Sequence, residues 1–464
     1  MATNTHTLHC CALGACVVLA SCAAPQLSPV HSVAGEIASR TGVNPAWGGD
    51  ASTAAPTSAT IRADAATPLP TPLDEGHAVA LALNASPEIA RLLAESAALR
   101  AEALEDATPM NPVLNFTSGV PLTPGAIVPI FAMVMVQLDE LWKQPIRSDI
   151  ARDSYEAALL SLASEAVALA TKARTLWHEI ALLEAQADSA AVTRDLTEQL
   201  LAWQRERFAV GEADGEMVAK ARMESAEAHH TDERTRQLLS ESRLSLMGVL
   251  GRAEAPEDWR VGAEDPASAR ALHGEIASEA AALREMAQLR LDVRAANARM
   301  KAAQSRWILA QRSRVGKIEI GAGWERDMED MSAAGVAALV ELPIFNDGSH
   351  RIAKAAAEYE VAAIAAETTR QTALIELRTA LAKARATQAM HGVGVDSTLA
   401  PASESVTRAQ AALEAGEGAR RDVASAERGF HQASMVVNDL ERDRRRARLD
   451  LVRATGFLSA EVSP

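Results

Sequence analysis

The sequence contains two copies of one pattern, and this duplication restricts the possible folds more than any other feature. Similar segments face one another when the chain is shifted by 204 positions, the separation of its only two tyrosines, Tyr155 and Tyr359. Further matches keep this register or depart from it by one inserted residue: QLDELWKQPIR at 137–147 with ELPIFNDGSHR at 341–351, FAVGEA at 208–213 with LEAGEG at 413–418, and RLSLMGVLG at 243–251 with RLDLVRATG at 448–456. A tandem repeat of this kind predicts two copies of one structural unit.

Each copy has the same predicted order: a helix, a β-hairpin and two long helices that turn at a glycine. Apolar residues recur at helical spacing in the helices and alternate with polar residues in the strands. The predicted bounds are 73–107, 113–138 and 149–250 in the first copy, and 278–313, 317–343 and 350–455 in the second. The repeats are predicted at 73–252 and 278–457, with a connection at 253–277 and a tail at 458–464. Gly392, Gly394 and Pro401 predict a kink or break in the long helix of the second copy.

The composition favours long packed helices over a compact enzyme fold. Apolar residues make up 48% of the chain but aromatic residues only 3%, and alanine, which favours helix, supplies much of the rest. The net charge of −15 argues against binding nucleic acid, which needs a basic surface, and fits a lumen that admits cations. Beyond residue 22 no segment is apolar for long enough to form a membrane helix. If the protein crosses a membrane, it does so with strands.

Four strands of about nine residues have the length that a transmembrane β-barrel needs, but four strands cannot close. Three chains would supply 12 strands, enough for an aqueous channel, whereas two would supply eight, whose interior side chains fill. We therefore predict a mainly α fold with a small β part: a tandem-repeat α-barrel of long helices, and strands that contribute to a trimeric 12-stranded transmembrane β-barrel. The alternation in the third strand predicts that Glu319 and Glu325 face the lumen, and that Ile318, Ile320 and Trp324 face lipid.

The N-terminus resembles a bacterial lipoprotein signal. All four cysteines lie within the first 22 residues, and LASC at 19–22 fits a lipobox after a short apolar segment. We predict a signal peptide at 1–21, acylation of Cys22, and a flexible, lipid-anchored tether at 22–72, where Pro, Ala, Ser, Thr and Gly predominate. Lys and Arg are missing before the apolar segment, so an ordinary export signal is the alternative. Ala23 after the cysteine points to the outer membrane.

Three segments resemble the TolC-type outer-membrane efflux channels, including their lipoprotein members. VELPIFNDGSHR at 340–351 is similar to the family's strand-to-helix signature, RLDVRAANARMKAAQ at 290–304 to the helix that opens its second repeat, and NPVLNF at 111–116 to the first strand of the metal-cation export branch. The resemblance implies a homotrimeric outlet in the outer membrane, held by lipid and barrel, with its helical part in the periplasm. It also implies two partners, a periplasmic adaptor protein and an inner-membrane efflux transporter of RND or related type. The first copy lacks the glycine of the signature near Lys143 or Gln144.

The turns between the long helices are the candidate functional sites. The resemblance implies adaptor contacts at two sets of tip residues: Phe208, Gly211 and Ala213, and Leu413, Gly416 and Gly418. It also implies a periplasmic gate at Asp422, with Arg420 and Arg421 as possible clamps. The alternative for the tips is ordinary helix-turn chemistry, and for Asp422 it is a solvated carboxylate favoured by the helix dipole.

We identify no catalytic, cofactor or metal site in the sequence, and predict that the protein is not an enzyme. The acidic loop at 327–331 could touch a cation but is predicted to be an ordinary exposed loop. The basic run RDRRRAR at 442–448 is predicted to be a solvated, salt-bridged helix face rather than a nucleic-acid patch. The efflux outlet therefore has one main competitor, a lipid-anchored periplasmic helical scaffold without channel activity, which would leave the strands unexplained.

Overall fold

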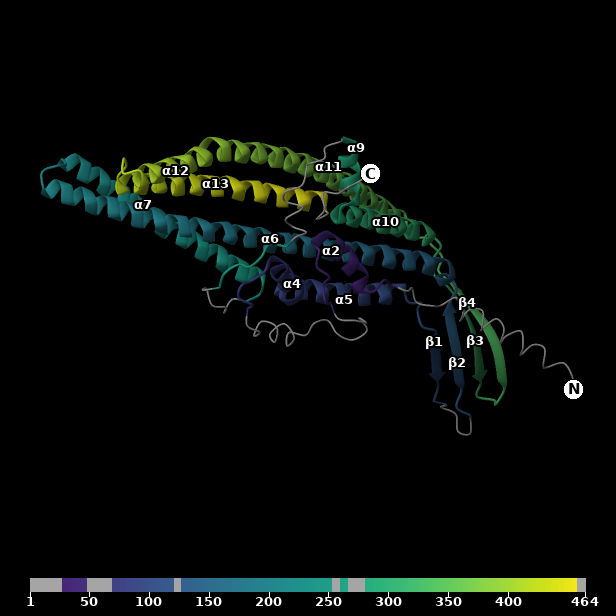
Figure 1. Cartoon of the computed structure of the whole chain (residues 1–464). Helices are drawn as coiled ribbons and strands as arrows, with labels where there is room; N and C mark the ends of the chain where they lie inside the picture. The colour runs from purple at the N-terminus through teal and green to yellow at the C-terminus, as the bar shows by residue number, and fades with distance from the viewer. Residues whose placement is uncertain (1–26, 48–68, 121–126, 253–258, 266–279, 457–464) are drawn as a thin grey trace. The chain divides into compact units, whose positions relative to one another are not determined.

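The computed structural model describes residues 27–47, 69–120, 127–252, 259–265 and 280–456, and it is mostly helical with one small sheet (Figure 1). The helices of the first half are η1 (Val30–Val33), α2 (Ala34–Thr41), α4 (Glu75–Ala85), α5 (Pro87–Ala107), α6 (Glu140–Ala209) and α7 (Gly215–Val249). Those of the second half are α9 (Ala280–Leu289), α10 (Leu291–Arg312), α11 (Ser349–Gly394), η2 (Val395–Leu399), α12 (Ala400–Glu414) and α13 (Arg420–Thr455). No helix among these residues is both long and apolar enough to cross a membrane.

The chain divides into two compact units, which we describe separately. Among the described residues, one comprises 27–30, Glu95–Ser161 and Asp292–Thr369, and holds the sheet. The other comprises His31–Ala94, Leu162–Leu291 and Arg370–Pro464, and holds the helical turns and the two apolar cores.

The sheet has four antiparallel strands in the order β1-β2-β3-β4. They are β1 (Val113–Ser118), β2 (Ile130–Gln137), β3 (Ile318–Arg326) and β4 (Ser332–Val340), so each repeat supplies one hairpin and β2 pairs with β3 between the repeats. The predicted hairpins are confirmed with shifted ends. β4 was expected over Gly335–Pro343, but it begins at Ser332, which pairs with Arg326, and it ends before Pro343, which has no N–H to donate.

The duplication is visible in the places where the helices break. Each predicted leading helix is two helices, divided at Ser86 in the first repeat and at Arg290 in the second, positions that correspond under the 204-residue shift. Ser86 is extended, with ψ 129°, because the following Pro87 disfavours the helical conformation of the residue before it.

The apolar cores of the helical unit correspond as well. The first core includes Trp177, Ile180, Leu246 and Val249, and the second includes their counterparts Leu381, Ala384, Leu451 and Ala454. Because corresponding positions of the two copies pack in corresponding cores, the predicted duplication extends from the sequence to the packing.

The single inserted residue of the second copy has a structural counterpart. The predicted break near Gly394 takes the form of the π-helical segment η2, in which the N–H of Ala400 donates to the carbonyl of Val395. A π-helical turn holds one more residue than an α-helical turn, so it absorbs an insertion without ending the helix. Gly394 lies beside this segment, and a Cβ there would come within 2.3 Å of Leu440 Cδ1 in α13.

Two predictions about this architecture are corrected. The first long helix begins at Glu140 rather than near Asp149, because the first copy lacks the turn residues that keep Glu341–Gly348 non-helical in the second. The tether predicted over 22–72 contains an ordered part, since residues 27–47 include α2, whose Ile37 is fully buried. Arg40 donates to the carbonyls of Leu289 and Gly456, at 3.1 and 2.8 Å, and the carbonyl of Thr41 accepts from Arg174.

Candidate functional site

The sheet carries one face that is apolar everywhere except at its loop ends. Alternate residues of a strand point to opposite faces, and paired residues share a face, so the registers define the two sets. The apolar face is formed by Leu114, Phe116, Ile130, Ala132, Val134, Val136, Ile318, Ile320, Ala322, Trp324, Ala334, Val336, Ala338 and Val340. Its side chains are accessible, with Val336 90% and Leu114 66% exposed. A contiguous exposed apolar face of this extent indicates contact with lipid or with another protein.

The opposite face of the sheet is mixed and carries the polar groups. Glu319 and Glu325 both lie on it, opposite Gln137 and Phe131 of β2, whereas Ile318, Ile320 and Trp324 lie on the apolar face. Glu325 is exposed, and Glu319 is largely buried and forms an ion pair with Lys317. The alternation predicted from the sequence is therefore present. The assignment of the two glutamates to a lumen stays a prediction.

Both outer edges of the sheet lack a strand partner within the described part of the chain. β1 pairs only with β2, and β4 only with β3, so β1 and β4 form the two borders of the sheet in Figure 1. A strand edge presents a row of unpaired N–H and C=O groups, which a membrane cannot satisfy. Both edges of this sheet therefore remain available for pairing with a further strand.

The strand-to-helix junction of the first repeat is buried and polar. After β2, the carboxylate of Asp139 accepts hydrogen bonds from Lys143 Nζ at 2.5 Å and from the backbone N–H of Ile318 at 3.2 Å. Burial acts to raise the pKa of Asp139, but these hydrogen bonds and the charge of Lys143 hold the pKa below its ordinary value. From the sequence, Lys143 was noted only as a departure from the family signature. Its role as the partner of a buried carboxylate was missed.

The helical turns lie in the other unit and have equivalent backbones. Gly211 and Gly416 both adopt left-handed conformations, with φ of 78° and 74°, and each ends its helix with a hydrogen bond to a carbonyl three residues back. The remaining predicted adaptor contacts surround them, with Phe208 53% and Leu413 36% exposed and with Ala213 and Gly418 half-buried. Helix-turn chemistry explains the two glycines, and it is compatible with a docking role for the tips.

Asp422 lies in the first turn of α13 and is exposed. Its carboxylate accepts hydrogen bonds from the backbone N–H of Ala419 at 3.1 Å and from Arg421 Nε at 3.2 Å, and Arg420 beside it is also exposed. In the first repeat the corresponding turn is closed differently, by Asp214, which accepts from the N–H of Met217 at 2.8 Å. Asp422 therefore has the capping role that was the alternative to the gate, and a gate role stays a prediction.

A tryptophan that was not singled out from the sequence connects the two tips. The guanidinium groups of Arg207 and Arg421 lie over the ring of Trp203, 4.8 and 5.1 Å from its centre. Such cation–π contacts contribute about 0.5–1 kcal/mol each at exposed sites. Arg421 thus contacts both Trp203 of α6, in the first repeat, and Asp422 of its own helix α13. The signal that could have located Trp203 is an aromatic residue two turns before the tip glycine in a chain with few aromatics.

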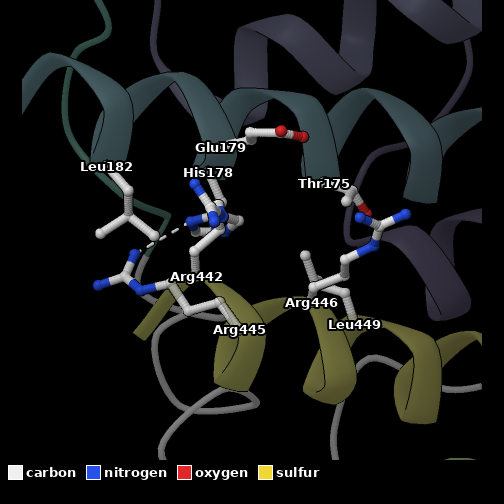
Figure 2. Close-up of a pocket in the computed structure, with 8 residues that line it drawn as sticks. All are labelled: Thr175, His178, Glu179, Leu182, Arg442, Arg445, Arg446 and Leu449. Carbon is white, nitrogen blue, oxygen red and sulfur yellow. Dashed lines mark hydrogen bonds between the residues drawn. The ribbon is translucent and has the colours of Figure 1, made fainter. Parts of the chain in front are cut away.

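A buried ionic network joins the first repeat to the last helix within the helical unit. Glu75, which is fully buried, accepts a hydrogen bond from Arg174 at 2.6 Å and lies 3.5 Å from His178 Nε2. His178 Nδ1 lies 3.1 Å from Arg445, as Figure 2 shows, and because arginine only donates, Nδ1 is the acceptor. Arg445 also binds Glu441, whose burial acts to raise its pKa but whose bonds with Arg444 and Arg445 lower the pKa to about 2.

The cavity at this network is too small to be a ligand site. It is lined by His178, Thr175 and Leu182 of α6 and by Arg442, Arg446 and Leu449 of α13 (Figure 2), and its volume of about 10 Å³ is that of one water molecule. A larger groove of about 530 Å³ separates α6 and α7 from α13 and is polar, crossed by the ion pair of Arg428 with Glu224. The basic run 442–448 forms the predicted ion pairs, of Arg442 with Asp439 and of Arg444 with Glu441. The solvated face that was predicted is wrong, because Arg444 and Arg448 are buried.

The acidic loop at 327–331 is closed by the side chain of Asp327. Asp327 accepts hydrogen bonds from the N–H groups of Glu329 and Met331, at 2.8 and 2.9 Å. Within the described ranges no cluster of three or more His, Cys, Asp or Glu residues could hold a metal ion. Cys22 lies outside the described residues, and its predicted acylation is not tested by the structure.

Comparison with known proteins agrees with this geometry. Residues 282–457, nearly the whole second repeat, match the family model of outer membrane efflux proteins. No curated protein sequence matches the chain. Among solved structures, CusC, studied for the conformational changes that accompany folding and transmembrane channel formation, aligns with a TM-score of 0.66 at 18% identity, over 82% of this chain and 92% of CusC.

Two further solved structures share the fold. The outer membrane protein VceC of Vibrio cholerae aligns with a TM-score of 0.64 at 17% identity, over 82% of this chain and 96% of VceC. The open-state outer membrane channel MtrE of Neisseria gonorrhoeae aligns with a TM-score of 0.56 at 18% identity, over 83% and 90% of the two chains. The second repeat therefore matches the family of outer membrane efflux proteins, and the chain shares its fold with these outer-membrane channels.

Proposed function

We propose that this chain, which has the fold of outer-membrane channels and a second repeat that matches the outer membrane efflux protein family, forms the outer-membrane outlet of an efflux system. In this proposal three copies close a 12-stranded barrel and their long helices form a tube in the periplasm. The channel is passive, and a pump in the inner membrane supplies both energy and selection. No enzymatic step is part of the function.

One observation carries the proposal: the four-stranded sheet has an exposed apolar face and two unpaired edges. Closure with other copies would satisfy the edge groups and would turn the apolar face toward lipid. Glu319 and Glu325, on the opposite face, would then face the lumen, where carboxylates favour cations. The competing scaffold function would leave this apolar face without a role.

The helical tips would serve the partners of the channel. A periplasmic adaptor that links the outlet to an inner-membrane transporter would contact the exposed turns around Gly211 and Gly416. Asp422, with Arg420 and Arg421, would form a ring of charge near the periplasmic entrance once three copies assemble. The exposure of Asp422 and its place two residues into α13 support this proposal, because they leave its carboxylate accessible to solvent and ions.

Reconstitution in planar bilayers tests the outlet against the scaffold. The purified protein should run as a trimer in detergent and should produce discrete conductance steps, because only a closed tube passes ions. A monodisperse monomer that retains the β-sheet signal would overturn the trimer, and a trimer without conductance would favour the scaffold.

Lipid attachment at Cys22 completes the proposal. Because every cysteine lies within the first 22 residues, Cys22→Ser should abolish metabolic labelling with palmitate while export continues. The barrel would keep part of the variant in the membrane. Labelling that persists in Cys22→Ser would contradict acylation at this position.

A further inference from the structure

The strand-to-helix junction of the second repeat presents three bare apolar side chains. Leu342 is 69% exposed, Ile344 72% and Phe345 fully, all within the few residues that follow β4. They lie in the same unit as the sheet and directly follow its edge strand β4, and the chain bends among them, since the N–H of Ile344 donates to the carbonyl of Leu342 at 2.8 Å.

The segment that carries these side chains is fixed by its own hydrogen bonds. Asn346 Oδ1 accepts from the N–H of Gly348, and Asp347 Oδ1 accepts from the N–H of Ser349, both at 3.0 Å. Gly348 has φ 76°, and Arg351 donates to the carbonyl of Ser313 at 2.8 Å. The exposed residues are therefore held in a defined position, as expected for side chains that pack against a partner.

The first repeat shows what covers the corresponding junction. There the N–H of Leu138 donates to the carbonyl of Ile318 at 2.8 Å, and Asp139 accepts from the N–H of Ile318. The junction after β2 thus packs on the start of β3, the next strand in the sheet. In a closed ring of copies, the strand next to β4 is β1 of the neighbouring copy. By the same topology, the junction after β4 would pack on the start of that strand.

The registers of the two hairpins specify how β1 and β3 correspond. Met135 pairs with Val113, and its counterpart Leu339 pairs with Glu319. Val113 therefore corresponds to Glu319, and Pro112 corresponds to the first residue of β3. The neighbouring copy's β1 can thus be aligned against β4 residue by residue.

This alignment specifies which residues meet after β4. The N–H of Leu342 would donate to the carbonyl of Pro112 in the neighbouring copy, as the N–H after β2 donates to the start of β3. The backbone turns at Pro343, because the N–H of Ile344 donates to the carbonyl of Leu342 at 2.8 Å, so the strand register ends at this contact. Ile344 and Phe345 follow the contact directly, and Met110, which is 56% exposed, and Pro109 precede Pro112 of the neighbouring copy at the same end of the edge.

Two prolines fit the same register. In the first repeat the N–H of Ile318 donates to the carboxylate of Asp139. Their counterparts in the contact between copies are Pro112, which has no N–H to donate, and Pro343, whose side chain has no acceptor. The contact between copies thus lacks both the N–H donor and the carboxylate acceptor of the contact within the chain. No donor or acceptor is left unpaired by the two prolines.

We propose that Leu342, Ile344 and Phe345 of one copy form an apolar clasp with Pro109 and Met110 of the next copy. This inference rests on the ring of copies in the proposed function, and it adds the register and the residues of the contact. Inside the chain the corresponding junction is polar, because Asp139 and Lys143 occupy the positions of Pro343 and Asp347. Strands β2 and β3 belong to one chain, whereas β4 and the neighbouring β1 belong to two. Burial of apolar side chains in the clasp would stabilise this second contact.

A second copy explains these residues better than lipid does. Ionic groups flank the clasp on both sides, since Glu341 accepts from the N–H of Lys317 and Asp347 pairs with Arg314 at 3.5 Å. Such groups oppose insertion of the segment into hydrocarbon. The residues just before β1, in contrast, lie at an open edge of the sheet, and Met110 among them is exposed and apolar.

Disulfide cross-linking of the full-length protein tests the register. Met110→Cys and Ile344→Cys combined should give covalent dimers and trimers on oxidation, while each single variant should not. Beyond residue 22 the chain has no cysteine of its own, so the introduced pair reports alone. The pair Leu114→Cys with Val340→Cys is the control for strand pairing in the same register, and Met110→Cys with Val336→Cys is a mismatched pair that should stay unlinked.

Truncation of the side chains tests the energetic role. The double variant Ile344→Ala with Phe345→Ala should raise the dissociation constant of the trimer in detergent more than about tenfold. A tenfold change corresponds to only about 1.4 kcal/mol, and burial of each side chain contributes more than half of that free energy. Val336→Ala, at an equally exposed position on the lipid-facing side, is the matched control and should leave the trimer unchanged.

The possible outcomes distinguish a failure of the clasp from a failure of the proposed outlet function. A stable trimer that links through residues 114 and 340 but not through 110 and 344 overturns the clasp and leaves the outlet intact. A trimer that is unaffected by Ile344→Ala with Phe345→Ala, while membrane association falls, assigns these residues to lipid and also overturns the clasp. A monomer in every condition removes the outlet itself.

Discussion

The first repeat carries its long helix from Glu140 to Ala209 without interruption, whereas the second divides the corresponding length among α11, η2 and α12. The difference begins at the strands, where the first repeat enters its helix directly and the second passes through a loop that ends at Gly348. Yet the hairpins, the leading helices and the apolar cores correspond. The two repeats therefore differ in two places: at η2, which holds the inserted residue, and at the junction between the second strand and the long helix, which packs against different segments in the two repeats.

The largest expected effect concerns the π-helical segment. Deleting Ala380, in the regular part of α11, turns all following residues by about 100° and directs Leu381 and Ala384 away from their core, at a cost of several kcal/mol. Deleting Thr398, inside η2, removes the extra residue of the second copy and should cost less than about 1 kcal/mol. Thermal unfolding midpoints of the two variants check the contrast, and equal losses would mean that η2 does not hold the insertion.

The buried network gives the next largest effect, and it distinguishes the repeats. Arg174→Met leaves Glu75 buried without its main partner and should destabilise the protein by about 3–5 kcal/mol. The counterpart of Arg174 in the second repeat is Arg378, which is exposed, so Arg378→Met should stay within about 0.5 kcal/mol. Chemical denaturation of both variants measures the difference. A similar cost at both positions would contradict the asymmetry.

The tip glycines should respond alike, because their backbones are alike. Gly211→Ala and Gly416→Ala each place a Cβ in open space but in a left-handed conformation, and each should cost about 1–2 kcal/mol. Gly429→Ala is the control, since it lies inside α13 with open space around it and should stabilise by about 0.8–1 kcal/mol. A clear difference between the two tip variants would show that one turn is held by contacts outside its own backbone.

The smallest expected effects are those of the two caps. Asp214→Ala should cost about 1 kcal/mol because it removes an N-cap acceptor, and Asp422→Ala about 0.5 kcal/mol because it removes a first-turn carboxylate. In single-channel recordings, however, only Asp422→Ala should weaken cation selectivity, with Asp214→Ala as the control. Unchanged selectivity in Asp422→Ala would leave capping as its whole role.

The periodic features were well predicted from the sequence. The hairpins, the long helices and the turns at Gly211 and Gly416 follow from local patterns, since alternation, helical spacing and glycine act on neighbouring residues. The π-helical segment was foreseen only as a break, because Gly392, Gly394 and Pro401 weaken an α-helix without specifying its replacement. Thus the local pattern indicated where the helix changes but not how.

Contacts between distant residues could not be predicted. The hydrogen bond between Asp139 and Ile318, the ring of Trp203 between two arginines and the burial of Arg174 all depend on which helices and strands become neighbours. The ordered segment around α2 was missed for the same reason. Its composition is that of a tether, and its order derives from partners far along the chain.

That segment has a consequence for the timing of biogenesis. Arg40 emerges early during synthesis, yet one of the carbonyls it binds belongs to Gly456, 416 positions later. Because synthesis runs from the N-terminus, the region of α2 cannot complete its contacts until α13 has been made. Docking of Arg40 therefore reports that α13 is in place, and a chain truncated before Gly456 would leave this arginine without that carbonyl.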